Sequence, residues 1–390
     1  MKSFSLASSA LSVAYSPNGN YLVVGFNNGA VQVLDSANGS LILKLGNHNG
    51  SVSYVSYAED GLKIISASID GVIKIWSGKD GRELLTFNDK ELASTLYKEL
   101  TLTRYKVASS MDGRYIVSGS GLTVRAWDIT NRQLLREFKE VKERTCVISS
   151  VAISPDGRRV VAGQDWSKMS CWDIQSGQLV FEKDIRESFN QWQHQWQQLS
   201  SVDYNPDGNC IVAGFWDGSI IIFDANNGQE IRQLVGHRKG EGKSCAMVFV
   251  KYSSNGQKIV SGSWDCKIKI WEAETGKEVK TIASKLKYHE SKYHGSNDTK
   301  GLLIPREILF YYQEEMQEKM KEERDNYFRE YLSVSYSPNQ QNIVSVDNKG
   351  TIKIWNVGNG EEIVRFVPRK EFLYLIWDKE AWISAGGPGL

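Results

Sequence analysis

Histidine and tryptophan side chains gather in one short stretch, NQWQHQWQQ, at residues 190–198. His194 lies between Trp192 and Trp196 and has a glutamine on either side. An imidazole in this company could ligate a metal, act as a catalytic base, or lie beside rings that stack on a ligand. It could equally be a structural histidine. The position of the stretch in the whole chain decides between these interpretations.

Other groups that could do chemistry lack the partners that the chemistry needs. His289 and His294 occur in KYHESKYH, a polar segment that supplies no further ligand set for a metal. The chain has no phosphate-binding loop, no nucleophile elbow and no zinc-protease motif. Its carboxylates are scattered and lie mostly in turn sequences, where Asp has a structural role. We therefore expect no catalytic residue, no metal and no cofactor.

Composition narrows the class of protein and of partner. The 390 residues include 47 Lys and Arg against 46 Asp and Glu, a net charge of +1, which gives no general reason to bind nucleic acid or an anionic membrane. The 5 cysteines form no C-x-x-C pair and are typical of reduced thiols. Neither a signal peptide nor an apolar run of membrane-spanning length is evident. We expect a cytoplasmic protein, with the nucleus as second choice, and no membrane partner.

A turn signal recurs along the chain and defines a repeat. Each copy lies between two short apolar segments, such as LSVAY and YLVVGF, and two more segments follow, such as AVQVLD and LILKL. Four short strands with turns between them, in units of about 42 residues, indicate a repeated four-stranded antiparallel sheet. We count seven units. The turn signals SPNG, AEDG, SMDG, SPDG, NPDG, SSNG and SPNQ end at Gly19, Gly61, Gly113, Gly157, Gly208, Gly256 and Gln340.

Short motifs inside the units resemble those of the WD-repeat (WD40) β-propeller family. The resemblance covers roughly residues 5–367 and implies an all-β, seven-bladed β-propeller of four-stranded antiparallel sheets, with a helical insertion before the last blade. It also implies a non-catalytic interaction scaffold, although a fold alone does not establish a function. The motifs are an S-x-x-x-D turn before the third strand, a GH pair and two WD pairs: Gly236-His237, Trp127-Asp128 and Trp172-Asp173.

In this family a His, a Ser or Thr, an Asp and a Trp form a hydrogen-bonded set, so that buried polar groups satisfy one another. Unit seven has Lys349 at the Asp position. His194 falls close to the His position of unit five, which favours a structural histidine paired with Asp217. Units two and six match the set fully, with His48, Ser66, Asp70 and Trp76, and with His237, Ser261, Asp265 and Trp271.

The units differ mainly in the connections from the fourth strand of one to the first strand of the next. In a propeller these connections emerge on the same face as the turns between the second and third strands. Large side chains with no evident folding role fall on this face, and such residues are typical anchors of protein interfaces. They could instead pack beneath the long connections, which are about 88–102, 182–199 and 283–331. The residues are Ile69, Tyr105, Trp166, Trp192, Trp196, Trp216 and Trp264.

The insertion and the C-terminal segment break the repeat. Residues 305–332 carry apolar side chains at helical spacing and are expected to form a helix. This helix could be a lid, a docking element, or a cover for the edge of its own blade. We expect one propeller domain over 1–367, followed by an extension over 368–390. Residues 372–387 resemble half a blade, and could be a partial eighth blade, a cap or the start of a further domain.

These patterns predict a scaffold that binds a protein or peptide on the insertion-bearing face, within a multi-protein complex. The alternative is a propeller associated with RNA or a ribonucleoprotein through the basic loop 236–244, with Arg238, Lys239 and Lys243. The near-neutral net charge makes nucleic acid the less favoured partner.

Overall fold

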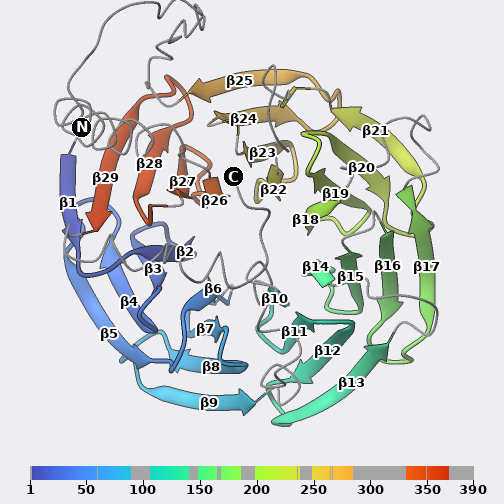
Figure 1. The fold of residues 1–390 in the computed structure, drawn as a ribbon, viewed down its shortest axis with the longest axis horizontal. Coiled ribbons are helices and arrows are strands. Elements are labelled where there is room, and N and C mark those ends of the chain that lie inside the picture. The colour runs from blue at the N-terminus through green and yellow to red at the C-terminus, as the bar shows by residue number, and fades with distance from the viewer. Residues whose placement is uncertain are drawn as a thin grey trace, which may run out of the picture.

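Seven β-sheets stand side by side around a central axis, like the blades of a propeller (Figure 1). The computed structural model describes most of the repeat region, and its described residues form strands and turns. They are 2–58, 60–88, 106–139, 148–164, 168–185, 198–234, 236–237, 248–263, 265, 267–283, 331–347 and 349–368.

Each blade has four antiparallel strands in sequence order, from the axis outward. The innermost strands are β2 (Ala10–Tyr15), β6 (Val52–Tyr57), β10 (Lys106–Ser109), β14 (Ile148–Ile153), β18 (Leu199–Tyr204), β22 (Val248–Tyr252) and β26 (Tyr331–Tyr336). The second strands are β3 (Tyr21–Phe26), β7 (Lys63–Ser68), β11 (Tyr115–Ser120), β15 (Arg159–Gln164), β19 (Cys210–Phe215), β23 (Lys258–Ser263) and β27 (Asn342–Asp347).

The two outer positions complete each blade. The third strands are β4 (Ala30–Asp35), β8 (Val72–Ser77), β12 (Thr123–Asp128), β16 (Lys168–Asp173), β20 (Ile220–Asp224), β24 (Lys267–Glu272) and β28 (Ile352–Asn356). The outer strands are β5 (Leu41–Asn47), β9 (Glu83–Asn88), β13 (Gln133–Lys139), β17 (Leu179–Asp184), β21 (Glu230–Leu234), β25 (Glu278–Ala283) and β29 (Glu362–Pro368). The predicted all-β, seven-bladed propeller is confirmed.

Burial follows the position of a strand in its blade. Second strands such as YLVVGF and KIISAS are buried after their first residue, because neighbouring blades cover both of their faces. Outer strands such as ELLTFN face solvent along most of their length. The core is therefore a series of layers between blades. One layer joins Met169 and Cys171 of blade four to Phe215 and Phe223 of blade five.

The recurring turn between the first two strands of a blade depends on a left-handed residue. In blade one, the Gly19 N–H donates to the Ser16 carbonyl oxygen at 2.8 Å, and Gly19 has φ 75°. Such a φ suits glycine, which has no Cβ to clash. In blade seven, Gln340 takes the same place with φ 58° and donates to the Ser337 carbonyl at 2.8 Å. The weaker sequence copy, SPNQ, thus forms the same turn.

Polar side chains on the innermost strands link one blade to the next around the axis. The Ser12 hydroxyl accepts the Val55 N–H at 3.0 Å, and the Ser150 hydroxyl accepts the Val202 N–H at 3.0 Å. Between blades five and six, the Asp203 carboxylate accepts from Lys251 Nζ at 2.8 Å.

The ring closes at blade seven with an additional strand. Blade seven has four strands of its own, and β1 (Lys2–Leu6) pairs in parallel with its outer strand, β29, as a fifth. Figure 1 shows β1 on the outside of β29. The predicted helix over 305–332 and the half-blade over 372–387 lie outside the described residues.

Candidate functional site

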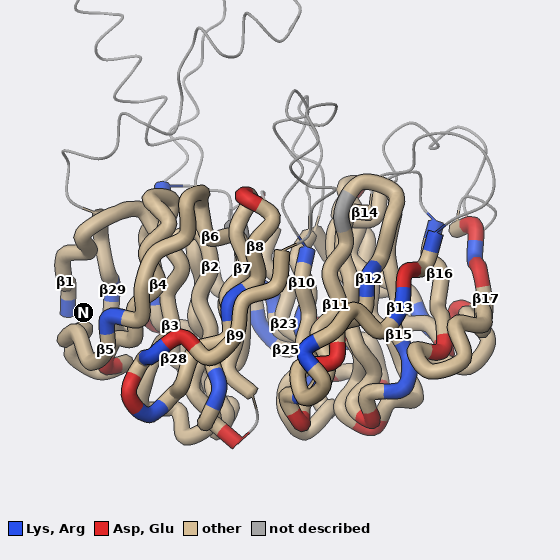
Figure 2. The backbone as a smooth tube through the Cα atoms, turned by 90° about the horizontal axis from the view of Figure 1, so that it is seen from below, with Lys and Arg blue, Asp and Glu red and all other residues tan. Residues whose placement is uncertain are grey.

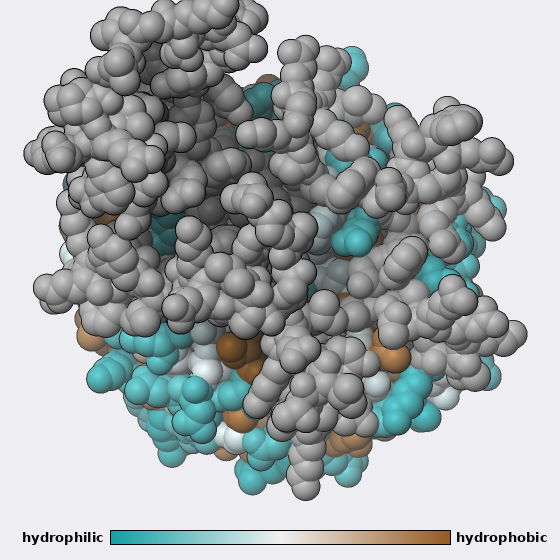
Figure 3. Space-filling model, in the orientation of Figure 1, coloured by the Kyte–Doolittle hydropathy of each residue, from teal (hydrophilic) through white to brown (hydrophobic). Residues whose placement is uncertain are grey.

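The propeller has two faces with different connections. We call upper the face that carries the turns between second and third strands and the end of each outer strand. It is at the top of Figure 2, and Figures 1 and 3 look onto it. The lower face carries the other two kinds of turn, which are short and bear charges of both signs (Figure 2). Five of the described ranges end at the upper ends of outer strands, which are β9, β13, β17, β21 and β25.

Two aliphatic side chains project from adjacent turns of the upper face. Ile69, between β7 and β8, is 53% exposed, and Leu122, between β11 and β12, is 40% exposed. Backbone hydrogen bonds anchor both turns: the Ile69 N–H donates to the Ser51 carbonyl at 3.0 Å, and the Ile148 N–H donates to the Gly121 carbonyl at 2.8 Å. Figure 3 shows hydrophobic residues among polar ones on the described part of this face. Sequence reasoning singled out Ile69 but missed Leu122, whose only signal is an apolar residue inside the turn SGLT.

Trp216 lies in the corresponding turn of blade five, between β19 and β20. It is half-buried, and its N–H donates to the Gln198 carbonyl at 2.9 Å. The structure therefore places Ile69 and Trp216 on one face, in turns of different blades. The other predicted binding residues lie outside the described residues: Tyr105, Trp166, Trp192, Trp196 and Trp264.

Blade six contains a complete chain of buried hydrogen bonds. His237 lies 2.9 Å from Asp265 through Nδ1 and 2.7 Å from the Ser261 hydroxyl through Nε2. The same hydroxyl accepts Nε1–H of Trp271 at 2.8 Å. His237, Ser261 and Trp271 are all buried. Each of these polar groups bonds to another member of the same set. The arrangement therefore has the features of a structural network, in which buried polar groups satisfy one another.

Blade two has the same groups in a looser arrangement. His48 Nε2 lies 2.7 Å from the Ser66 hydroxyl, which accepts Nε1–H of Trp76 at 2.8 Å. Nδ1 of His48, however, is 3.8 Å from Asp70, whose carboxylate instead accepts the Asn49 N–H at 2.8 Å. Burial lowers the pKa of His48 to about 4, although the Asp70 carboxylate opposes the shift. His48 is therefore neutral at physiological pH.

Other blades keep only parts of the set. Indole N–H groups donate to serine hydroxyls in blade three, from Trp127 to Ser118 at 3.0 Å, and in blade seven, from Trp355 to Ser345 at 2.8 Å. In blade five, the Asp217 carboxylate accepts both the N–H and the hydroxyl of Ser219, at 2.9 and 2.6 Å. The predicted partner of Asp217, His194, lies outside the described residues, so their pairing stays a prediction.

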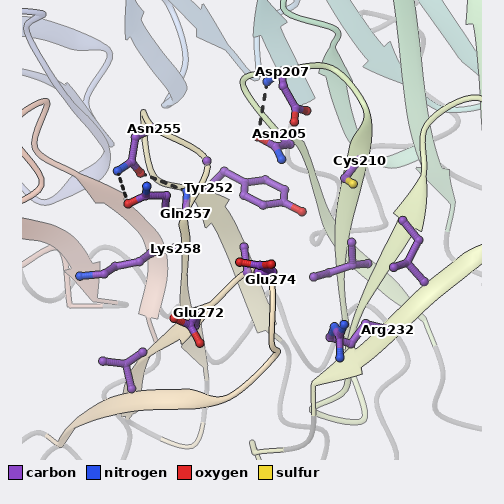
Figure 4. A pocket seen from close by; sticks show the side chains of 15 residues that line it. Asn205, Asp207, Cys210, Arg232, Tyr252, Asn255, Gln257, Lys258, Glu272 and Glu274 are labelled. Carbon is purple, nitrogen blue, oxygen red and sulfur yellow. Dashed lines mark hydrogen bonds between the residues drawn. The ribbon is translucent and has the colours of Figure 1, made fainter.

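A hollow lies between blades five and six, beside the turns of the lower face. It has a volume of 600 Å³, and the Tyr252 ring points across it toward Cys210 (Figure 4). Charges of both signs line it, from Arg232, Lys258 and two glutamates. A smaller hollow of 340 Å³ lies between blades one and two. Neither hollow lies on the upper face.

The described cysteines are poorly suited to nucleophilic chemistry. Burial raises the pKa of the Cys210 thiol, and it raises the pKa of the Cys171 thiol to about 11. The reactive species is the thiolate, so both groups are held in their less reactive form at neutral pH. Within the described ranges, His, Cys, Asp and Glu form no cluster of three or more that could hold a metal ion.

Three family models match parts of the chain. Residues 111–304 match the nucleolar protein 10-like N-terminal domain, and residues 4–60 match the anaphase-promoting complex subunit 4 WD40 domain. Residues 330–356 match the WD domain, G-beta repeat. Together with the seven four-stranded blades, these matches decide the family. The chain is a WD-repeat β-propeller.

Curated relatives resemble this WD-repeat propeller over part of their length. Periodic tryptophan protein 2 homolog of Dictyostelium discoideum is 26% identical over 57% of the chain and 23% of the relative. Telomerase protein component 1 of Rattus norvegicus is 25% identical over 59% of the chain and 8% of the relative. Guanine nucleotide-binding protein subunit beta of Oryza sativa subsp. indica is 25% identical over 55% of the chain and 57% of the relative. The chain thus covers less than two thirds of each.

Across the part of the propeller that the structure describes, no helix is both long and apolar enough to cross a bilayer.

Proposed function

We propose that this WD-repeat propeller is a non-catalytic scaffold that binds a protein or peptide partner on its upper face, within a multi-protein complex. The observation that carries the proposal is the pair of exposed aliphatic side chains, Ile69 and Leu122, in adjacent upper turns. Exposed apolar groups on well-anchored turns lose water on binding without a change of fold. The half-buried Trp216 lies on the same face, in the corresponding turn of blade five.

The comparisons support a role in an assembly. Two of the relatives named above carry the words subunit or component in their names, and one family model describes a subunit of the anaphase-promoting complex. The nucleolar description of the longest family match favours the nucleus over the cytoplasm that composition suggested first. Each name belongs to a relative, so the partner is defined here by chemistry: an apolar segment that covers Ile69 and Leu122.

A matched pair of double variants tests the proposal. Ile69→Asp with Leu122→Asp places charges on the upper face, and Leu62→Asp with Met111→Asp places them on the lower face of the same two blades. The control residues are as exposed, at 63% and 43%. We expect the upper variant to lower partner recovery, measured by quantitative affinity purification and mass spectrometry, by at least about tenfold. Equal recovery with both variants would contradict the proposal.

A second candidate function is association with RNA or a ribonucleoprotein. The nucleolar family description and the telomerase component among the relatives favour it. The basic loop 236–244 would supply phosphate contacts through Arg238, Lys239 and Lys243. Such binding falls steeply with salt, so a titration of a fluorescent single-stranded RNA from about 50 to 200 mM salt tests it. RNA affinity that is undetectable at low salt removes this candidate.

A further inference from the structure

Blade seven is unlike the other six blades in its outer edge. Its outer strand, β29, already completes a four-stranded sheet, and β1 adds a fifth strand in parallel, with Lys2 opposite Val364 and Leu6 opposite Pro368. The pairing begins directly after the bulge at which β29 shifts register between Ile354 and Trp355 of β28. Blade seven has the same four strands as the other blades, so β1 is an addition to a sheet that already has its full number of strands.

Two side chains hold β1 in place. The Phe4 ring stacks on Phe366, with centroids 5.7 Å apart and planes at 29°. Its other neighbour is Gly39 of blade one, where a Cβ would come within 3.1 Å of the Phe4 ring. Leu6 is 4% exposed and packs into the core between blades seven and one. The edge therefore selects an aromatic residue followed, two positions later, by an aliphatic one.

We propose that the outer edge of blade seven is a strand-docking site that accepts an extended segment of a partner protein in place of β1. The partner segment runs parallel to β29, with an aromatic side chain on Phe366 and an aliphatic one in the position of Leu6. Main-chain hydrogen bonds to the edge supply affinity, and the two side chains supply specificity, as in other cases of strand addition. This site is separate from the upper turns and does not depend on binding there.

Competition with β1 sets the conditions for exchange. A three-residue link, residues 7–9, joins β1 to β2, so β1 stays near its edge at an effective concentration in about the millimolar range. A partner segment must therefore bind the edge tightly enough to overcome this local concentration of β1. The remaining β1 side chains, Lys2, Ser3 and Ser5, are exposed. These side chains therefore add little to the stability of the β1–β29 pairing.

A labelled peptide with the sequence of residues 1–8, MKSFSLAS, is the probe. The full chain carrying Phe4→Asp and Leu6→Asp releases its own strand and keeps blade seven four-stranded. We expect this variant to bind the probe at least about tenfold more tightly than the wild type does, by fluorescence anisotropy. A control peptide with the same two substitutions should not bind. Hydrogen exchange should show new protection at the amides of 364–367 when the probe is bound.

Three results would contradict the proposed strand-docking site. The first is a variant that keeps its melting temperature and its circular dichroism but does not distinguish the two peptides. The second concerns the wild type alone, and decides the matter if the variant does not fold. If β1 amides exchange as slowly as those of β27, β1 leaves only on global unfolding, and no partner can take its place. The third is a wild-type dimer that the two substitutions abolish, which assigns the edge to a second copy.

Discussion

Blades five and six have the same strand order but are built around different interiors. Blade six buries His237, Ser261 and Trp271 in one hydrogen-bonded network. Blade five has Ala213 and Phe223 where blade six has the serine and the tryptophan, and its interior is apolar. Both blades bury their second strands to the same degree. The polar network is therefore one of two solutions for a blade, and its contribution depends on every member being present.

The largest expected effect comes from breaking the network at its centre. Ser261→Ala in blade six removes the hydroxyl that serves both His237 and Trp271, and leaves two buried nitrogens without a partner. We expect a loss of about 2–4 kcal/mol in the free energy of unfolding, measured by urea denaturation. Phe223→Leu in blade five, which removes part of a buried ring from an apolar interior, should cost less, about 1–1.5 kcal/mol. Equal costs would show that the network contributes no more than apolar packing.

Acid should weaken blade two through His48. Its pKa is about 4 in the folded chain and near its ordinary value of about 6.5 in the unfolded chain. Above that ordinary value both states are neutral; as the pH falls toward 4, only the unfolded chain gains the proton. Stability should therefore decline across this window, by up to about 3 kcal/mol. Unfolding measured at about pH 7 and pH 5 checks this, and His48→Gln should flatten the dependence. An unchanged slope in that variant would assign the decline to other groups.

The reverse exchange tests whether blade five tolerates a polar group. Ala213→Ser places a hydroxyl at the position that Ser261 has in blade six, but Phe223 stands in place of Trp271 and has no donor to offer it. The expected loss is about 1–2 kcal/mol, because a buried polar group without a partner keeps its desolvation cost. Thermal unfolding by circular dichroism measures it. A gain in stability would mean that blade five holds a partner for the hydroxyl.

The smallest effect separates the two versions of the network. Asp265→Asn removes the charge 2.9 Å from His237, and should cost about 1 kcal/mol, because hydrogen bonds to charged groups are the stronger ones. Asp70→Asn in blade two should cost less than about half of that, since 3.8 Å is too long for a hydrogen bond. Paired urea unfolding curves compare them. A larger cost at Asp70 would contradict the geometry.

Local patterns sufficed to predict most of the fold. Alternating segments such as VSYVSY and turn sequences such as SPNG depend on neighbouring residues, and they predicted the blades and the tight turns. The pairing of β1 with β29 joins the two ends of the repeat, and no local pattern identifies such a distant partner. Likewise, His48–Asp70 and His237–Asp265 have the same residue types at matching positions of the repeat, which does not reveal that only the second pair is within hydrogen-bonding distance.

The candidate site was predictable only in part. An exposed apolar residue such as Ile69 stands out beside a turn Asp, and so it was found. Leu122 lies in a turn without that Asp, and its exposure depends on how the turn projects from the blade. Trp216 is half-buried, which its position in the sequence does not indicate.

The most direct test of the scaffold is a map of where the partner binds. Hydrogen–deuterium exchange of the chain, alone and in its purified complex, measures this without any substitution. The account predicts that slower exchange on binding is concentrated in the upper turns, at 68–71, 120–123 and 215–219. Slower exchange confined to the lower ends of β21 and β25, around Ile231 and Val279, would contradict this account.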